Sequence, residues 1–195
     1  MASRRALGRE LAREMRGVSA DMVVPVPDSG VPAALGFSEE SAIPFELGFV
    51  RSHYVGRTFI QPAQVLRDAS VALKLSPVRE VLKGKRIVLV DDSLVRGTTS
   101  KKICRMLRRV GVKEIHMAIS SPPIVSPCYY GIDTPREEEL IASRKSRDEV
   151  RRFIGVASLY HLSVQGMIRA AGGGGNGYCT ACFTRKYPTP IPDFK

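Results

Sequence analysis

The sequence predicts an α/β protein whose mostly parallel central sheet is flanked by helices. Apolar, strand-like segments alternate along the chain with segments that have the spacing of amphipathic helices, and this alternation is typical of parallel sheets with right-handed crossovers. The segment RIVLV at 86–90 contains four consecutive apolar residues, as expected of a strand buried on both faces. With 195 residues, 44% of them hydrophobic and 25% charged, the chain is long enough for a domain with a sizeable core.

The first half of the chain predicts two helices and two strands. In order, they are a helix over 3–16, a strand over 21–27, a helix over 31–42 and a strand over 46–51. Pro25 and Pro27 predict that the first strand ends in a loop, because proline cannot continue a regular central strand. The polar stretch 52–82 is predicted to be a long connection, and connections of that length are usually functional or mobile.

The second half predicts two more strands, over 86–90 and 114–120, and three helices, over 100–110, 147–154 and 163–171. Within the first of these helices, Ile103, Met106, Leu107 and Val110 recur at the spacing of one helix face. The tail, 172–195, is rich in glycine and proline and is expected to be irregular. Because no internal repeat and no second domain is evident, we expect a single domain over 1–195.

The net charge of +11 at pH 7, from 30 basic and 19 acidic residues, has three interpretations. They are a solvated basic surface, a nucleic-acid-binding surface, and a site for a small, highly phosphorylated substrate. Nucleic acid is not expected as a partner, because the chain has no tryptophan, no RNA-binding aromatic signature and no zinc-finger spacing. Basic residues near the motifs described next favour the phosphorylated substrate.

Localisation signals are also missing from the sequence. No apolar run approaches the roughly 20 residues of a membrane span. The N-terminal segment lacks the apolar core of a secretory signal, and Glu10 and Glu14 weigh against an organelle transit peptide. We therefore expect a cytoplasmic protein with no membrane partner.

The end of the apolar run 86–90 carries the strongest functional signal. Ligands of parallel sheets bind beyond the carboxyl ends of the strands, where Asp91 and Asp92 are expected. Gly97 allows a tight turn, and the hydroxyls and backbone N–H groups at the start of the next helix, over 98–100, are suited to a phosphate. The carboxylates can contact ribose hydroxyls or hold a divalent cation. The order of these features favours a sugar-phosphate site over the alternative, an acidic strand end followed by a Ser/Thr helix cap.

Other motifs are absent or less specific. Neither a Walker loop nor the G-x-G-x-x-G dinucleotide fingerprint occurs. Cys179 and Cys182 have a spacing used for metals, clusters and redox pairs, whereas a disulfide framework is not expected without a sign of secretion. The three histidines, His53, His116 and His161, are expected to be structural or exposed to solvent.

The stretch VLVDDSLVRGTTS at 88–100 resembles the phosphoribosyl-pyrophosphate motif of type I phosphoribosyltransferases, in the form typical of the amidophosphoribosyltransferase family. Five further stretches resemble the same family: PVPDSGVPAALGF at 25–37, HYVGRTFIQP at 53–62, SSPPIVSPCYYGIDT at 120–134, EELIAS at 138–143 and CTACFTRKYPT at 179–189. Together they span nearly the whole chain. The resemblance implies the type I phosphoribosyltransferase fold, with a flexible catalytic loop and an irregular C-terminal region.

The resemblance also implies roles for individual residues. Asp91 and Asp92 would contact the ribose hydroxyls and Mg²⁺, and Ser29 would support the metal. The loop from Asp28 to Gly30 would lie near the pyrophosphate. Tyr54 and Arg57 belong to the motif of the flexible loop that closes over the substrate, which implies a catalytic role. The 5-phosphate would be held by Gly97, Thr98, Thr99 and Ser100.

The implied reaction is displacement of pyrophosphate from C1 of phosphoribosyl pyrophosphate by ammonia, which gives 5-phosphoribosylamine in the first step of de novo purine synthesis. Purine nucleotides are implied as inhibitors, and homo-oligomers are usual in the family. The alternative from another class is a non-catalytic module that senses phosphoribosyl pyrophosphate or nucleotides.

Two parts of the family pattern are missing. Full-length members carry an N-terminal glutaminase domain with a cysteine nucleophile, and no cysteine precedes Cys104 here. We therefore expect this chain to use free ammonia, or ammonia from a glutaminase supplied in trans, and not to hydrolyse glutamine. Cys128, Cys179 and Cys182 match three ligands of the iron–sulfur cluster found in one branch of the family. Because such clusters use four thiolates, we expect an incomplete cluster site.

Overall fold

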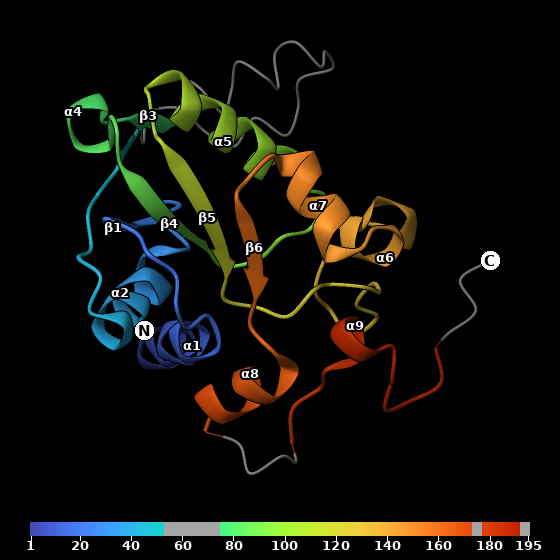
Figure 1. Cartoon of the computed structure of the whole chain (residues 1–195). Coiled ribbons are helices and arrows are strands. Elements are labelled where there is room, and N and C mark those ends of the chain that lie inside the picture. Colours follow the sequence, from blue (N-terminus) through green and yellow to red (C-terminus); the bar gives the residue numbers. More distant parts are fainter. Residues whose placement is uncertain (53–74, 173–176, 192–195) are drawn as a thin grey trace.

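The structure is a computed structural model that describes residues 1–52, 75–172 and 177–191. Its main sheet has four parallel strands in the order β1-β4-β5-β6 (Figure 1). Their bounds are Met22–Pro25 for β1, Arg86–Asp91 for β4, Glu114–Ile119 for β5 and Ser158–His161 for β6. The predicted α/β class and mainly parallel sheet are therefore confirmed.

The register of the sheet aligns apolar side chains in rows. Val24 pairs with Leu89, Leu89 with Met117 and Met117 with Leu159, and all four side chains are buried in one core cluster. The neighbouring positions point to the opposite face and form a second cluster. This two-sided burial explains why β4 has a continuous apolar sequence and not an alternating one.

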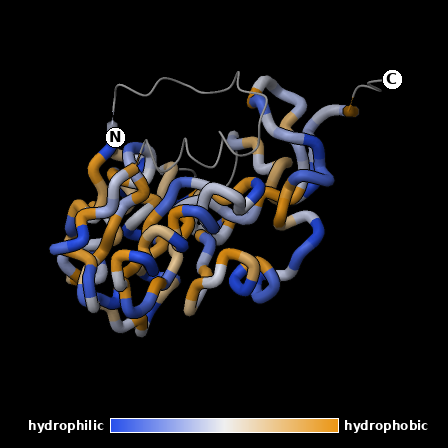
Figure 2. Tube along the Cα trace, turned by 90° about the horizontal axis from the view of Figure 1, so that it is seen from above, coloured by the Kyte–Doolittle hydropathy of each residue, from blue (hydrophilic) through white to orange (hydrophobic). Residues whose placement is uncertain are grey.

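Helices cover both faces of the sheet (Figure 1). The helices α1 (Ala2–Glu14), α2 (Val31–Ser41) and α8 (Val164–Ala170) contribute side chains to the core cluster on one face. The helices α5 (Thr98–Arg109) and α7 (Arg147–Ile154) contribute to the cluster on the other. Figure 2 shows hydrophobic and hydrophilic residues interspersed along the chain. Among the described residues, no helix is long and apolar enough to cross a membrane.

Helices α1 and α2 approach each other closely enough for their backbones to touch. A Cβ atom added at Gly8 would lie 1.9 Å from the carbonyl oxygen of Ala33, and one added at Gly36 would lie 1.9 Å from that of Arg5. Neither position can carry a side chain without separating the helices, because both contacts are with backbone atoms. The two glycines thus set the distance between α1 and α2.

A second, antiparallel sheet lies beside the first and consists of β2 (Phe49–Arg51) and β3 (Leu75–Pro77), followed by the one-turn helix α4 (Arg79–Leu82). The long connection predicted over 52–82 therefore contains a strand and a helical turn within residues 75–82 that were not predicted. Leu75 and Leu82 are buried in the main core cluster, and this tertiary burial stabilises elements too short to give a sequence pattern.

The last part of the chain contains short elements that the sequence pattern did not indicate. They are the 3₁₀ helix η1 (Glu137–Glu139), α6 (Ile141–Arg144), β6 and, within the tail, α9 (Ala181–Thr184). Helix α7, which was predicted, begins with a capping box in which Ser146 and Glu149 exchange hydrogen bonds. It ends at Gly155, which has a φ of 79°.

Candidate functional site

The loops that follow β1 and β4 lie side by side at the carboxyl edge of the sheet. The N–H of Val26 donates to the carbonyl of Val90 over 2.8 Å, and the N–H of Gly30 donates to the carbonyl of Val26 over 3.0 Å. A Cβ atom added at Gly30 would lie 2.5 Å from the Val90 oxygen, so this loop packs tightly against the end of β4. The structure therefore brings the predicted 28–30 segment to the same place as Asp91 and Asp92.

The two aspartates have different environments. Asp91 is only 8% exposed, and its Oδ1 accepts the N–H of Asp92 over 2.9 Å. Burial, with the charge of Asp92 as the second cause, raises the pKa of Asp91 to about 8. Asp92 is half-buried, and its carboxylate accepts the hydroxyl of Ser93 over 3.2 Å. Within the described parts of the chain no cation compensates the Asp91 carboxyl group, so this group is suited to a ligand that brings positive charge.

Gly97 occupies a position that favours glycine for two reasons. It precedes α5 with a φ of 72°, in the left-handed region. A Cβ atom there would also lie 2.9 Å from Cδ1 of Ile141. The tight turn at this position directs the first amide groups of α5 beyond the end of β4.

Helix α5 begins with the three predicted hydroxyl residues. Their N–H groups are in the first turn, where no intrahelical acceptor exists, and this end of a helix favours anions. Thr98 and Thr99 are exposed, whereas Ser100 is only 4% exposed. The hydroxyls accessible to a ligand are therefore those of Thr98 and Thr99, and Ser100 can contribute its backbone N–H.

Two ion pairs border the site, and the sequence did not single out either of them. Arg51, at the end of β2, pairs with Asp28 in the loop after β1. Arg96, in the loop after β4, pairs with Glu139 in η1 at 2.8 Å. The partners are 23 and 43 residues apart in the chain, so no local pattern could have revealed them.

The residues at the strand ends fit Mg²⁺ of the kind the resemblance implies. Mg²⁺ commonly takes one or two carboxylates and completes its coordination with waters and substrate phosphates. Asp91 and Asp92 provide two adjacent carboxyl groups, and the buried one, Asp91, has no compensating cation among the described residues. Ser29 lies half-buried in the neighbouring loop. No group of three or more His, Cys, Asp or Glu side chains within the described ranges could hold a metal ion without such a substrate.

The cysteines do not fit a four-thiolate cluster. The N–H groups of Val125 and Ser126 donate to the carbonyl of Cys182 over 2.9 and 3.1 Å, which brings the tail back to the segment before Cys128. Burial, and then the charges of Cys128 and Cys179, raise the pKa of the Cys182 thiol. Cys104, the remaining cysteine, is fully buried, with a pKa raised to about 12. Within the described residues, Cys128, Cys179 and Cys182 do not form a group that could hold a metal ion, and no fourth cysteine lies with them.

Tyr54 and Arg57, the predicted residues of the flexible loop, lie outside the described residues, and their roles stay predictions.

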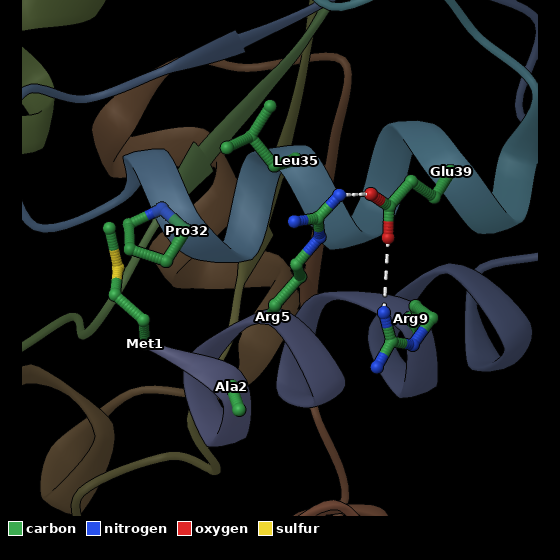
Figure 3. A pocket seen from close by; sticks show the side chains of 7 residues that line it. All are labelled: Met1, Ala2, Arg5, Arg9, Pro32, Leu35 and Glu39. Carbon is green, nitrogen blue, oxygen red and sulfur yellow. Dashed lines mark hydrogen bonds and ion pairs between the residues drawn. The ribbon is translucent and has the colours of Figure 1, made fainter.

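A pocket of about 450 Å³ lies elsewhere, between α1 and α2 (Figure 3). Its charged side chains already pair with each other, because the carboxylate of Glu39 forms ion pairs with both Arg5 and Arg9. The pocket therefore offers little unpaired charge, and it contains none of the predicted site residues.

Comparisons with known proteins agree with the resemblance read from the motifs. Residues 4–124 match the family model described as the phosphoribosyl transferase domain. The chain is 55% identical over 193 residues to amidophosphoribosyltransferase 1, chloroplastic, of Arabidopsis thaliana, with 99% of this chain and 34% of the relative covered. It is 54% identical over 193 residues to the amidophosphoribosyltransferase of Bacillus subtilis, with 97% and 40% covered. The chain thus spans about a third to two fifths of the length of these curated relatives.

Solved structures give the same result. The structure of "the allosteric regulatory enzyme of purine biosynthesis" superposes with a TM-score of 0.88 at 53% identity, over 99% of this chain and 42% of that one. The glutamine phosphoribosylpyrophosphate amidotransferase of B. subtilis, complexed with ADP and GMP, also gives 0.88, at 52% identity, over 99% and 43%. These likenesses confirm the type I phosphoribosyltransferase fold, and the chain belongs to the phosphoribosyl transferase domain family.

Proposed function

We propose that this chain transfers an amino group from ammonia to C1 of phosphoribosyl pyrophosphate. The C1–N bond forms, the bond from C1 to the pyrophosphate oxygen breaks, and the products are 5-phosphoribosylamine, pyrophosphate and a proton. The proposal makes the chain a pentosyl-transferring enzyme of purine synthesis. The curated relatives named above, at 54–55% identity, support this reaction class.

One observation carries the proposal. A buried carboxyl group, Asp91, and an anion-binding helix start, Gly97 to Ser100, follow the same strand and flank one loop. We propose that the 5-phosphate binds to the N–H groups of residues 98–100 and to the hydroxyls of Thr98 and Thr99. The ribose hydroxyls would bind to Asp91 and Asp92, which fixes the sugar with C1 directed away from the helix.

The loop after β1 would receive the leaving group. Asp28 to Gly30 pack against the end of β4, so a diphosphate attached to the bound ribose would lie near their backbone. Asp91 and Asp92, with Ser29 beside them, would hold Mg²⁺ together with substrate oxygens. When bound, the ion neutralises the negative charge that grows on pyrophosphate. We propose that Arg57 and Tyr54 act over the same substrate, and that Arg51 supplies a further cation near the pyrophosphate.

Several partners belong to the same proposal. The nitrogen would come from free ammonia or from a glutaminase unit acting in trans. Purine nucleotides are proposed as regulators, supported by the B. subtilis relative that is complexed with ADP and GMP. A homo-oligomer and a cytoplasmic location are proposed on family grounds, although plant relatives are named chloroplastic.

The test is ammonia- and Mg²⁺-dependent release of pyrophosphate from phosphoribosyl pyrophosphate. We expect turnover that rises with pH, because unprotonated ammonia is the nucleophile, and that falls in Asp92→Asn. Asp21→Asn is a matched control, because Asp21 lies at the opposite edge of the sheet beside Arg86. Saturable substrate binding without release, at high ammonia and raised pH, would contradict the enzyme and support the alternative, a sensing module.

A further inference from the structure

A second pocket, of about 400 Å³, lies on the other side of the loop that follows β4. Its apolar wall includes Leu94 from that loop, Val125 from the segment after β5 and Val150 from α7. Its polar lining comes from Lys145, Arg147, His161 and Ser163. A volume of this size is in the range of small-molecule pockets, roughly 300–1,000 Å³, and the combination of apolar walls with few polar groups is typical of them.

Among the polar side chains that line this pocket, His161 stands out because its ring nitrogens lack hydrogen-bond partners. It ends β6, next to Ile119 of β5, and so lies at the carboxyl edge of the sheet. Both of its ring nitrogens are buried, and neither has a hydrogen-bond partner within the described part of the chain. Burial, and then the charge of Arg147, lower the pKa of His161 to about 4. At neutral pH the ring is therefore a neutral imidazole with one donor and one acceptor to be satisfied.

The other polar side chains of the pocket differ in whether they already bond to other residues of the chain. Ser163 is already used, because its N–H and hydroxyl donate to the carboxylate of Glu14 over 2.8 and 2.6 Å. Lys145 and Arg147 are exposed, and no ion pair joins either of them to another described residue. Hydrogen bonds lower the pKa of the neighbouring Glu149 and Asp148, and the charges of Lys145 and Arg147, respectively, help to lower it further. The pocket thus combines two exposed cations and an imidazole without hydrogen-bond partners with apolar walls.

We propose that this pocket, which we call the His161 pocket, binds a small organic anion. The apolar body would pack against Leu94 and Val150. The anionic group would lie between Lys145 and Arg147 and accept a hydrogen bond from the imidazole. An inorganic anion would leave the apolar wall uncovered, and a neutral molecule would leave both cations unpaired. Since Leu94 belongs to the loop after β4, the ligand would contact that loop from the side away from Gly30.

Ring ¹⁵N signals of histidine in the full chain can test the proposal without any enzymatic readout. Benzoate is the probe, and His161→Phe identifies the His161 signals. We expect benzoate to shift these signals saturably. Acetate lacks the apolar body and benzyl alcohol lacks the charge. Each should bind at least about tenfold more weakly than benzoate.

Variants at the pocket rim provide the matched comparison. Replacing both Lys145→Gln and Arg147→Gln should weaken benzoate binding about tenfold, and the fold should be retained because both side chains are exposed. Arg144→Gln removes a neighbouring charge that does not line the pocket, and it should bind benzoate as the parent does. The proposal is overturned if benzoate leaves the His161 signals unchanged, if acetate binds as tightly as benzoate, or if the double variant binds like the parent.

Discussion

The two ends of strand β4 differ in whether the carboxyl group beside them is paired with a cation. At the amino end, Asp21 accepts both the N–H of Arg86 over 2.7 Å and its guanidinium over 3.0 Å. These hydrogen bonds, with the arginine charge, lower the pKa of Asp21. At the carboxyl end, Asp91 is buried with no cation beside it in the described part of the chain, and its pKa is raised to about 8. The paired acid, Asp21, stabilises the fold, whereas the uncompensated acid, Asp91, is the one that we propose to bind a ligand.

Asp91→Asn should have the largest effect on activity. Without this carboxylate the site would lose its proposed anchor for the ribose and for a cation, and pyrophosphate release should fall by a factor on the order of 10² or more. Asp21→Asn, at the other end of the strand, should leave the rate unchanged. Steady-state release of pyrophosphate measures both variants. Equal activity of the two variants would remove the functional distinction between the ends of β4.

The two ends also carry comparable glycines. Gly84 precedes β4 with a φ of 77° and has open space around it, whereas Gly97 follows β4 with a φ of 72° and a close contact to Ile141. Gly84→Ala should cost about 1 kcal/mol from backbone strain alone. Gly97→Ala should cost about 2–3 kcal/mol, since steric contact adds to the strain. Urea denaturation of both variants measures the difference, and equal losses would mean that the Ile141 contact relaxes freely.

The pH dependence of stability should have opposite signs at the two ends. The folded chain holds a proton on Asp91 that the unfolded chain releases above its usual pKa of 3.8, so this group lowers stability as the pH rises from about 4 to about 8. Asp21 has a lowered pKa, so its contribution is present above 3.8 and is lost as the pH falls below it.

Thermal unfolding measured from below pH 3.8 up to pH 9 would give both slopes. Asp91→Asn should remove the decline between pH 4 and pH 8, and Asp21→Asn should retain it. A parent chain whose stability does not decline over that range would show that Asp91 is already ionised and compensated in solution.

Arg51→Gln should have the smallest effect on the fold. Its ion pair with Asp28 is exposed, and exposed pairs contribute little to stability. The KM for phosphoribosyl pyrophosphate should nevertheless rise several-fold, with a smaller change in kcat, because the lost cation lies near the expected pyrophosphate position. Arg86→Gln, in the pair at the amino end, is the control and should leave KM unchanged. If KM rose in Arg86→Gln and not in Arg51→Gln, the diphosphate of the substrate would have to bind elsewhere.

The sequence predicted most of the scaffold because β4, β5, α5 and α7 have strong local patterns. It missed β3 and β6, which are three and four residues long and exist because the core buries Leu75 and Leu159. The candidate site was found at Asp91 to Ser100 because its residues are contiguous in the chain. Arg51 beside Asp28, the burial of Ser100 and the His161 pocket were not predicted, since each depends on contacts between distant segments.

The contact between α1 and α2 has a consequence for how related sequences should vary. Gly8 faces the backbone at Ala33, and Gly36 faces the backbone at Arg5. The two glycines therefore do not face each other. A larger residue at one position cannot be accommodated by a change at the other. Both positions should therefore stay small independently, and the close contacts at these two glycines would leave no trace in correlated substitutions.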